Sequence, residues 1–269
     1  MSGADIFSHP APAGAKRIAY GRMALQFGDL RLPAGGGPFP VVIMIHGGFW
    51  RSAYDLEHTG HLCAALTDAG VATWNIEYRR VGNPGGGWPG TFFDVALATD
   101  FVRELARSYP LDLSRVVVAG HSAGGHLALW VAGRQRIPAT SPLYCVDPLP
   151  LHGVVSLAGV SDLLAAWQLN LSSGAVRDLL GGAPERVPER YAEASPAALL
   201  PLGVRQALIH GTLDDTVPFS LSKSYSDAAA AQGDPVTLLP LPGAGHFEPI
   251  DPSSQEWPLV RECILHLLQ

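Results

Sequence analysis

Residues 115–125 read RVVVAGHSAGG, and they join a strand pattern to a helix pattern. The run 115–119 is typical of a buried strand, and residues 125–132 (GHLALWVA) are typical of a buried helix. The G-x-S-x-G motif between them predicts a tight turn, because glycines two residues before and after Ser122 avoid Cβ clashes. Such a turn exposes the serine hydroxyl at the end of a sheet, where the amides of the helix would face an oxyanion. We interpret Ser122 as an activated nucleophile, with a plain strand-to-helix turn as the alternative.

The rest of the chain alternates between strand and helix patterns. Continuous apolar runs are typical of strands buried on both faces of a parallel sheet, and they occupy residues 41–45, 71–76, 116–119, 154–157, 207–210 and 236–239. One or two edge strands are expected within residues 18–32. Helical patterns occupy residues 56–69, 92–109, 122–133, 221–232 and 257–268. This alternation predicts an α/β fold with a doubly wound, mostly parallel central sheet flanked by helices.

The length of 269 residues and the single run of alternating elements favour one domain over residues 1–269. One stretch, residues 162–201, departs from the alternation and contains proline, glycine and short amphipathic pieces. It is too long and too apolar for a simple connection, yet too short to be an independent domain. We expect it to form a small cap or insertion over the site.

Composition excludes several classes of function. A net charge of −6 and a pI near 5.9 give no electrostatic reason to expect binding to nucleic acid or to a membrane. Cys63, Cys145 and Cys263 are far apart and lack metal-site spacing, which favours a reduced compartment and no metal. Residues 1–16 contain no apolar signal segment, and no run is long enough to span a membrane. We therefore expect a cytoplasmic protein that needs no cofactor, with oligomerisation possible but not indicated.

A reactive serine needs a base to take its proton and a carboxylate to orient that base. In this architecture the acid and then the histidine should follow the serine along the chain, each on a loop after a strand. Asp214 and Asp215 directly follow a predicted strand, and one of them is expected to be structural, as a turn or helix cap. His246 lies in a glycine-bounded loop after the last predicted strand, which makes it the candidate base.

The loop HGGFW at residues 46–50 follows a predicted strand and is the candidate oxyanion loop. Its two glycines allow the backbone to approach a substrate carbonyl, so the amides of Gly48 and Phe49 can act together with that of Ala123. Each such donor contributes on the order of 2.7–4 kcal/mol to transition-state stabilisation. Other histidines have weaker claims to catalysis. His46 and His210 are expected to brace loops, and the turn geometry is expected to point His121 away from the site.

Four motifs together resemble the α/β-hydrolase superfamily: HGGFW (46–50), GHSAGG (120–125), HGxxDxxVP (210–218) and GHF (245–247). They occur in order over nearly the whole chain. The H-G-G-aromatic-W form is similar to the kynurenine formamidase and small carboxylesterase branch, whereas hormone-sensitive-lipase-type esterases carry a third glycine in place of Phe49. The resemblance implies an α/β-hydrolase fold with Ser122 as nucleophile, Asp214 as acid and His246 as base.

Aromatic residues gather near the expected mouth of the site and predict an apolar, concave substrate pocket. Besides Phe49, the candidate substrate-binding residues are Trp50, Tyr54, Trp88, Trp167, Phe219 and Phe247. Several of them could equally be core or loop anchors. Arg79 and Arg80 could bind a substrate carboxylate, although structural ion pairs are the favoured interpretation.

The favoured function is hydrolysis of small carboxylic esters through an acyl-enzyme. The alternative is an arylformamidase acting on an N-formylkynurenine-like amide, because the chemistry and the site would be the same. A non-catalytic hydrolase-fold protein that binds a small ligand is disfavoured, because all three triad residues are present.

Overall fold

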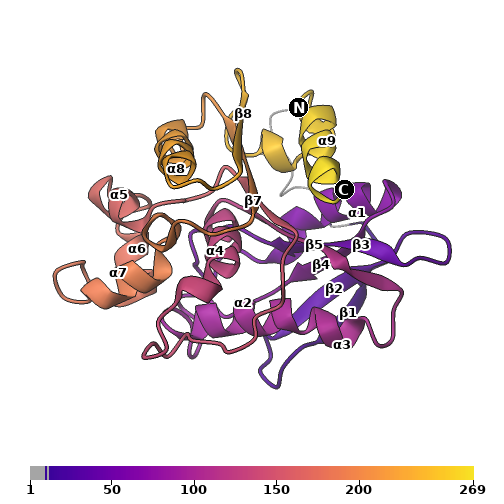
Figure 1. The fold of residues 1–269 in the computed structure, drawn as a ribbon, viewed down its shortest axis with the longest axis horizontal. Coiled ribbons are helices and arrows are strands. Elements are labelled where there is room, and N and C mark those ends of the chain that lie inside the picture. The colour runs from indigo at the N-terminus through magenta and orange to yellow at the C-terminus, as the bar shows by residue number, and fades with distance from the viewer. Residues whose placement is uncertain (1–9, 11) are drawn as a thin grey trace.

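An eight-stranded sheet forms the centre of the computed structural model, which describes residue 10 and residues 12–269 (Figure 1). At one edge, β2 pairs in the antiparallel direction with both β1 and β4. The other strands run parallel to one another in the order β4-β3-β5-β6-β7-β8. The N-terminal stretch, expected to contain no signal segment, lies largely outside the described residues. The strands are β1 (Lys16–Ala19), β2 (Phe27–Arg31), β3 (Phe39–Ile45), β4 (Ala72–Ile76), β5 (Leu111–His121), β6 (Gly153–Leu157), β7 (Arg205–Gly211) and β8 (Val236–Leu241).

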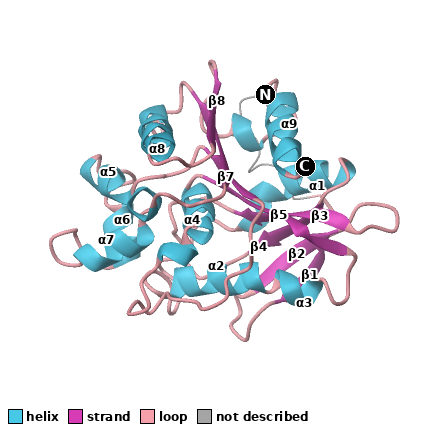
Figure 2. Cartoon of the chain, viewed as in Figure 1, coloured by secondary structure: helices cyan, strands magenta, loops and turns pink. Residues whose placement is uncertain are grey.

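Helices cover both faces of this sheet, as the fold class predicted (Figure 2). Helices α1 and α9 pack on one face, and α2, α4 and α8 pack on the other. Within the described residues, no helix is both long and apolar enough to cross a membrane. The helices are α1 (Gly60–Asp68), α2 (Gly90–Asp100), α3 (Val102–Leu105), α4 (Ala123–Ala132), α5 (Leu163–Gln168), α6 (Ala175–Leu180), α7 (Pro188–Ala194), α8 (Phe219–Ala231) and α9 (Trp257–Leu267).

The alternation of side chains along the strands gives the sheet two separate hydrophobic cores. In β3, Val41 and Ile43 pack on the α2/α4 face, whereas Val42 and Met44 pack on the α1/α9 face. All four side chains are fully buried. This arrangement explains the continuous apolar runs of the inner strands, because helices cover those strands on both faces. The edge strand β8 is only partly buried.

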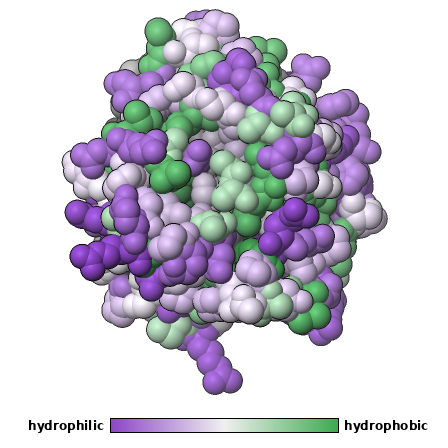
Figure 3. All heavy atoms as spheres, turned by 60° about the vertical axis from the view of Figure 1, so that its left-hand side comes forward, coloured by the Kyte–Doolittle hydropathy of each residue, from purple (hydrophilic) through white to green (hydrophobic). Residues whose placement is uncertain are grey.

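Residues 162–201 form the short helices α5, α6 and α7, which lie beside α4 at the left of Figure 1. Asp162 caps α5 by accepting hydrogen bonds from the amides of Leu164 and Ala165. The segment is anchored to the rest of the fold, since the Trp88 amide donates to the carbonyl of Leu179. On the face turned forward in Figure 3, hydrophobic and hydrophilic residues are interspersed.

Candidate active site

Ser122 stands between β5 and α4 with φ +55° and ψ −119°. A non-glycine residue in this region carries roughly 1–3 kcal/mol of backbone strain. The flanking glycines make the turn possible. A Cβ on Gly124 would lie 2.0 Å from the carbonyl oxygen of Ile45, and a Cβ on Gly120 would lie 2.1 Å from that of Gly124. The predicted strand-to-helix turn is therefore confirmed.

Asp214 and His246 are brought together from loops that follow β7 and β8. The Nδ1–H of His246 donates to Oδ2 of Asp214 over 2.7 Å. The other carboxylate oxygen accepts from the amides of Thr216 and Val217, over 2.9 and 2.8 Å. Asp215, the alternative acid, is exposed, and its side chain accepts a hydrogen bond from the Thr216 hydroxyl. The geometry thus favours Asp214 as the partner of the candidate base.

His210 braces the acid loop, in line with its predicted role. Its Nε2–H lies 3.1 Å from Oδ2 of Asp214 and 2.9 Å from the carbonyl oxygen of Val217. Burial alone would raise the pKa of Asp214, but the hydrogen bonds from His210 and His246 hold it well below its ordinary value of 3.8. Asp214 is therefore a carboxylate at neutral pH and can stabilise a cationic His246.

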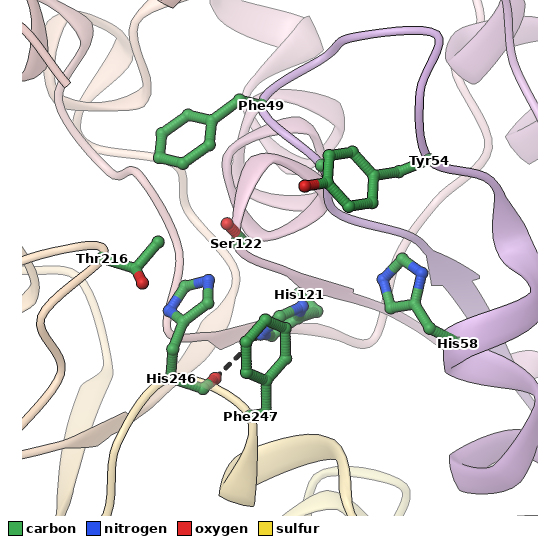
Figure 4. A pocket seen from close by; sticks show the side chains of 9 residues that line it. Phe49, Tyr54, His58, His121, Ser122, Thr216, His246 and Phe247 are labelled. Carbon is green, nitrogen blue, oxygen red and sulfur yellow. Dashed lines mark hydrogen bonds between the residues drawn. The ribbon is translucent and has the colours of Figure 1, made fainter. Parts of the chain in front are cut away.

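Ser122 and His246 lie side by side at the cavity, and the Nε2 edge of His246 faces the serine (Figure 4). Because Nδ1 carries the proton that Asp214 accepts, Nε2 of the neutral ring has the free lone pair that a general base needs. No hydrogen bond joins these two described side chains in the structure. Such bonds often tighten only when substrate is bound.

His121 does not point away from the site, and that expectation was wrong. Its Nε2–H donates over 2.9 Å to the carbonyl oxygen of His246, and its ring lines the cavity (Figure 4). The physical reason is the two-residue period of β5. Val117 and Ala119 face the α1/α9 side, so His121 faces the same side, along which the His246 loop runs. Burial keeps the pKa of His121 well below 6.5, so the ring is neutral.

The cavity in front of Ser122 has a volume of about 200 Å³. Three of the predicted aromatic side chains line it, namely Phe49, Tyr54 and Phe247. His58 and Thr216 also line it, although neither was predicted from the sequence. His58 lies in the helical turn Leu56–Thr59, and burial lowers the pKa of this histidine to about 3. The remaining lining residues are Gly48, His121, Ser122 and His246.

Four predicted substrate-binding aromatics are absent from the cavity wall that the described residues form. Trp50 is fully buried in the core. The Trp88 ring packs edge-on against Phe92, 5.4 Å between centroids. Phe219 packs edge-on against His210, and Trp167 packs on the core from α5. Each of these rings packs inside the fold rather than against the cavity. Local sequence does not distinguish a packed aromatic ring from one that lines a pocket.

The insertion also contributes no residue to this wall. Its predicted role as a cover over the site therefore stays a prediction.

The oxyanion loop adopts a strained conformation next to Ser122. Gly48, Phe49 and Trp50 have φ values of +106°, +48° and +57°, three left-handed residues in succession. A Cβ on Gly48 would lie 2.5 Å from Cβ of Tyr54, so glycine is needed there for space as well as for conformation. The turn is closed by a hydrogen bond of 3.0 Å from the Arg51 amide to the Gly48 carbonyl.

The third candidate donor is the Ala123 amide at the start of α4. No side chain caps this helix N-terminus in the described part of the chain. Its first amides are therefore available to an oxyanion, as are those of the strained loop. His46, at the start of that loop, is held in place by the segment after β4, because its Nε2 lies 3.1 Å from Glu77 and its ring stacks on Tyr78.

Arg79 and Arg80 form ion pairs inside the fold. Arg79 binds both carboxylate oxygens of Asp94 over 2.7 Å, and Arg80 lies 3.2 Å from Glu77. This supports the structural interpretation of both arginines over substrate binding. Among the residues described, no three His, Cys, Asp or Glu side chains gather as metal ligands would.

Comparisons with known proteins place the chain in a family. A family model described as BD-FAE matches residues 29–228. Esterase LipC of Mycobacterium tuberculosis is 29% identical over 250 residues, which cover 88% of this chain and 60% of LipC. The chain thus spans about three fifths of that relative.

Two solved structures have the same fold. A truncated carbohydrate esterase from gut microbiota has a TM-score of 0.82 at 22% identity, covering 96% of this chain and 99% of that one. Esterase B from Lactobacillus rhamnosis, inhibited by a tributyrin phosphonate, has a TM-score of 0.83 at 18% identity, covering 99% and 89%. None of these proteins is described as a kynurenine formamidase, so that part of the resemblance stays a prediction. The chain belongs to the BD-FAE family and has the fold of the α/β-hydrolase superfamily.

Proposed function

We propose that this protein is a serine hydrolase that cleaves small carboxylic esters through an acyl-enzyme. The observation that carries the proposal is the strained Ser122 at the mouth of a cavity that it shares with the Asp214-bound His246. The similarity to esterase LipC supports the same reaction. The cavity of about 200 Å³ favours a short acyl group.

In the proposed mechanism, Nε2 of His246 takes the hydroxyl proton as Ser122 attacks the ester carbonyl. The amides of Gly48, Phe49 and Ala123 stabilise the negative charge on the carbonyl oxygen of the tetrahedral intermediate. His246 then gives its proton to the departing alcohol, which leaves an acyl group on Ser122. Water activated by His246 attacks the acyl-enzyme and releases the carboxylic acid.

The first test is Ser122→Ala with short p-nitrophenyl esters as substrates. We expect the wild type to hydrolyse them and the variant to lose about 10⁵- to 10⁶-fold in kcat, because no other group replaces the nucleophile. Ser108→Ala is the control, since Ser108 is exposed beyond α3. A fluorophosphonate should label the wild type and Ser108→Ala but not Ser122→Ala.

Retention of full esterase activity by Ser122→Ala would overturn the assignment of the nucleophile. A folded wild type that neither reacts with the fluorophosphonate nor hydrolyses esters would instead indicate a non-catalytic ligand-binding protein. Including N-formylkynurenine in the substrate panel separates the arylformamidase alternative, since deformylation faster than ester cleavage would favour it.

A further inference from the structure

Trp50 links the oxyanion loop to the helix that follows the nucleophile. Its side chain turns away from the cavity and is fully buried, and its indole Nε1–H donates to Nδ1 of His126 over 3.1 Å. His126 in turn donates its Nε2–H over 2.9 Å to the carbonyl oxygen of Ala194. Three segments that are distant in sequence are therefore joined by one chain of buried hydrogen bonds: the oxyanion loop, α4 and the insertion.

The direction of these bonds is fixed by the histidine. The Ala194 carbonyl can only accept, so Nε2 of His126 carries the proton, and Nδ1 of the neutral ring accepts from Trp50. A protonated ring would set its Nδ1–H against the Trp50 indole N–H. Burial prevents this by lowering the pKa of His126 to about 4.

His126 is close to the candidate oxyanion donors in the fold. His126 lies one helical turn after the nucleophile, and its amide donates to the Ser122 carbonyl over 3.1 Å. The Ala123 amide belongs to the same turn of α4, whereas the Phe49 amide belongs to the loop that Trp50 holds. The Trp50–His126 bond thus spans the two elements that supply the proposed oxyanion donors.

The strained loop has other contacts as well. The Val81 amide donates to the Trp50 carbonyl over 2.8 Å and joins the loop to the segment after β4. The Arg51 guanidinium donates to the Ser172 carbonyl over 2.6 Å and lies 3.6 Å from Asp178, but its side chain is 37% exposed. Left-handed residues such as Phe49 and Trp50 persist only where the surroundings fix them. The buried indole bond joins this loop directly to α4, whose first turn carries the Ala123 amide.

We propose that Trp50 and His126 are positioning residues that hold the Phe49 amide at the distance from the Ala123 amide that an oxyanion requires. The inference rests on the proposed hydrolase function. It changes the predicted role of Trp50, which acts through the loop backbone rather than by contact with substrate. The insertion takes part through Ala194, which orients His126.

The experiment compares Trp50→Phe with Trp74→Phe. Both tryptophans are fully buried and each donates a single indole hydrogen bond, which for Trp74 goes to the Ala98 carbonyl, away from the site. We expect Trp50→Phe to lower kcat about 10- to 100-fold with little change in KM, since small misplacements of catalytic groups have effects of this size. Affinity for a trifluoromethyl ketone, which forms a tetrahedral adduct on Ser122, should fall in parallel. Trp74→Phe should leave kcat and that affinity unchanged.

If Trp50→Phe fails to fold, two substitutions of His126 test the same chain of hydrogen bonds. The side-chain oxygen of His126→Asn can occupy the position of Nδ1 and accept from Trp50, whereas the amide of His126→Gln reaches the position of Nε2 and donates to Ala194. We expect His126→Asn to retain more of the wild-type kcat than His126→Gln.

The inference is overturned if Trp50→Phe keeps the wild-type kcat and trifluoromethyl ketone affinity, or if His126→Gln is as active as His126→Asn. These outcomes are distinct from failure of the proposed function. In that case the wild type itself would show no Ser122-dependent hydrolysis and no adduct with the ketone.

Discussion

Asp94 and Asp214 are both completely buried carboxylates, yet they have different partners. Asp94 is bound by the guanidinium of Arg79, by the Arg79 amide over 3.0 Å and by Gln26 over 2.6 Å. Asp214 is bound by two histidines and two backbone amides. A guanidinium is permanently charged, whereas an imidazole gains and loses a proton near neutral pH.

This difference separates a structural ion pair from the pair that we propose to be catalytic. The Arg79–Asp94 pair joins the segment after β4 to α2, and its guanidinium stays protonated. Asp214 has a partner, His246, whose other nitrogen faces Ser122 in a cavity. The same residue type thus serves the fold in one place and the proposed chemistry in the other.

The strongest test of the comparison is Asp214→Asn. We expect kcat to fall about 10⁴-fold with a modest effect on stability. The Asn oxygen can still accept from the Thr216 and Val217 amides, but its NH₂ group faces His246 and favours the tautomer with Nδ1 unprotonated. Steady-state ester hydrolysis measures the first effect and urea unfolding the second. If activity persists near the wild-type level, Asp214 is structural like Asp94.

The converse test is Asp94→Asn. Removing one partner of a buried ion pair leaves the other uncompensated, and we expect a loss of about 3 kcal/mol in the free energy of unfolding. This figure is at the low end for buried pairs because the Arg79 side chain is 17% exposed. The kcat of the folded variant should stay close to that of the wild type. If Asp94→Asn were stable but lost as much activity as Asp214→Asn, Asp94 would not be a purely structural carboxylate.

The effect that is smallest for each residue concerns acid. Burial lowers the pKa of His58 to about 3 and that of His126 to about 4, and it also lowers that of His121. Below pH 6.5 the unfolded chain therefore binds protons that the folded protein excludes. Stability is full above pH 6.5 and falls as the pH decreases towards the folded-state pKa values, by about 1.4 kcal/mol per histidine per pH unit.

Urea unfolding at pH 7.5, 6.5 and 5.5 measures this dependence. His58→Phe should reduce the slope below pH 6.5, whereas Asp94→Asn should lower stability without changing the slope, since Arg79 stays charged throughout. A stability that is independent of pH between 7.5 and 5.5 would contradict the neutral state of the buried histidines.

Much of the site was predictable because chain order and strand ends are local features. The runs of apolar residues predicted the strands, and the glycines around Ser122 predicted the turn. His246 follows the last strand in a glycine-bounded loop, so its place was predictable as well. The role of His121 was missed, although the two-residue period of β5 already assigned it to the face along which the His246 loop runs.

The aromatic residues show what local sequence could not decide. Trp50 and Tyr54 lie four residues apart in one loop, yet Tyr54 lines the cavity and Trp50 is in the core. The backbone is left-handed at Phe49 and Trp50, and the Trp50 side chain binds His126, which lies 76 positions away in the chain.

The sequence by itself determined the α/β alternation, the order of the candidate triad and the glycines that its turns need. These follow from side-chain period and backbone freedom, which neighbouring residues define. The resemblance to known motifs already implied Asp214 as the partner of His246. Only the tertiary structure decided which aromatic rings face the cavity and how His126 joins the oxyanion loop to the insertion. Those outcomes depend on packing and hydrogen bonds between segments far apart in the chain, and no local pattern encodes such contacts.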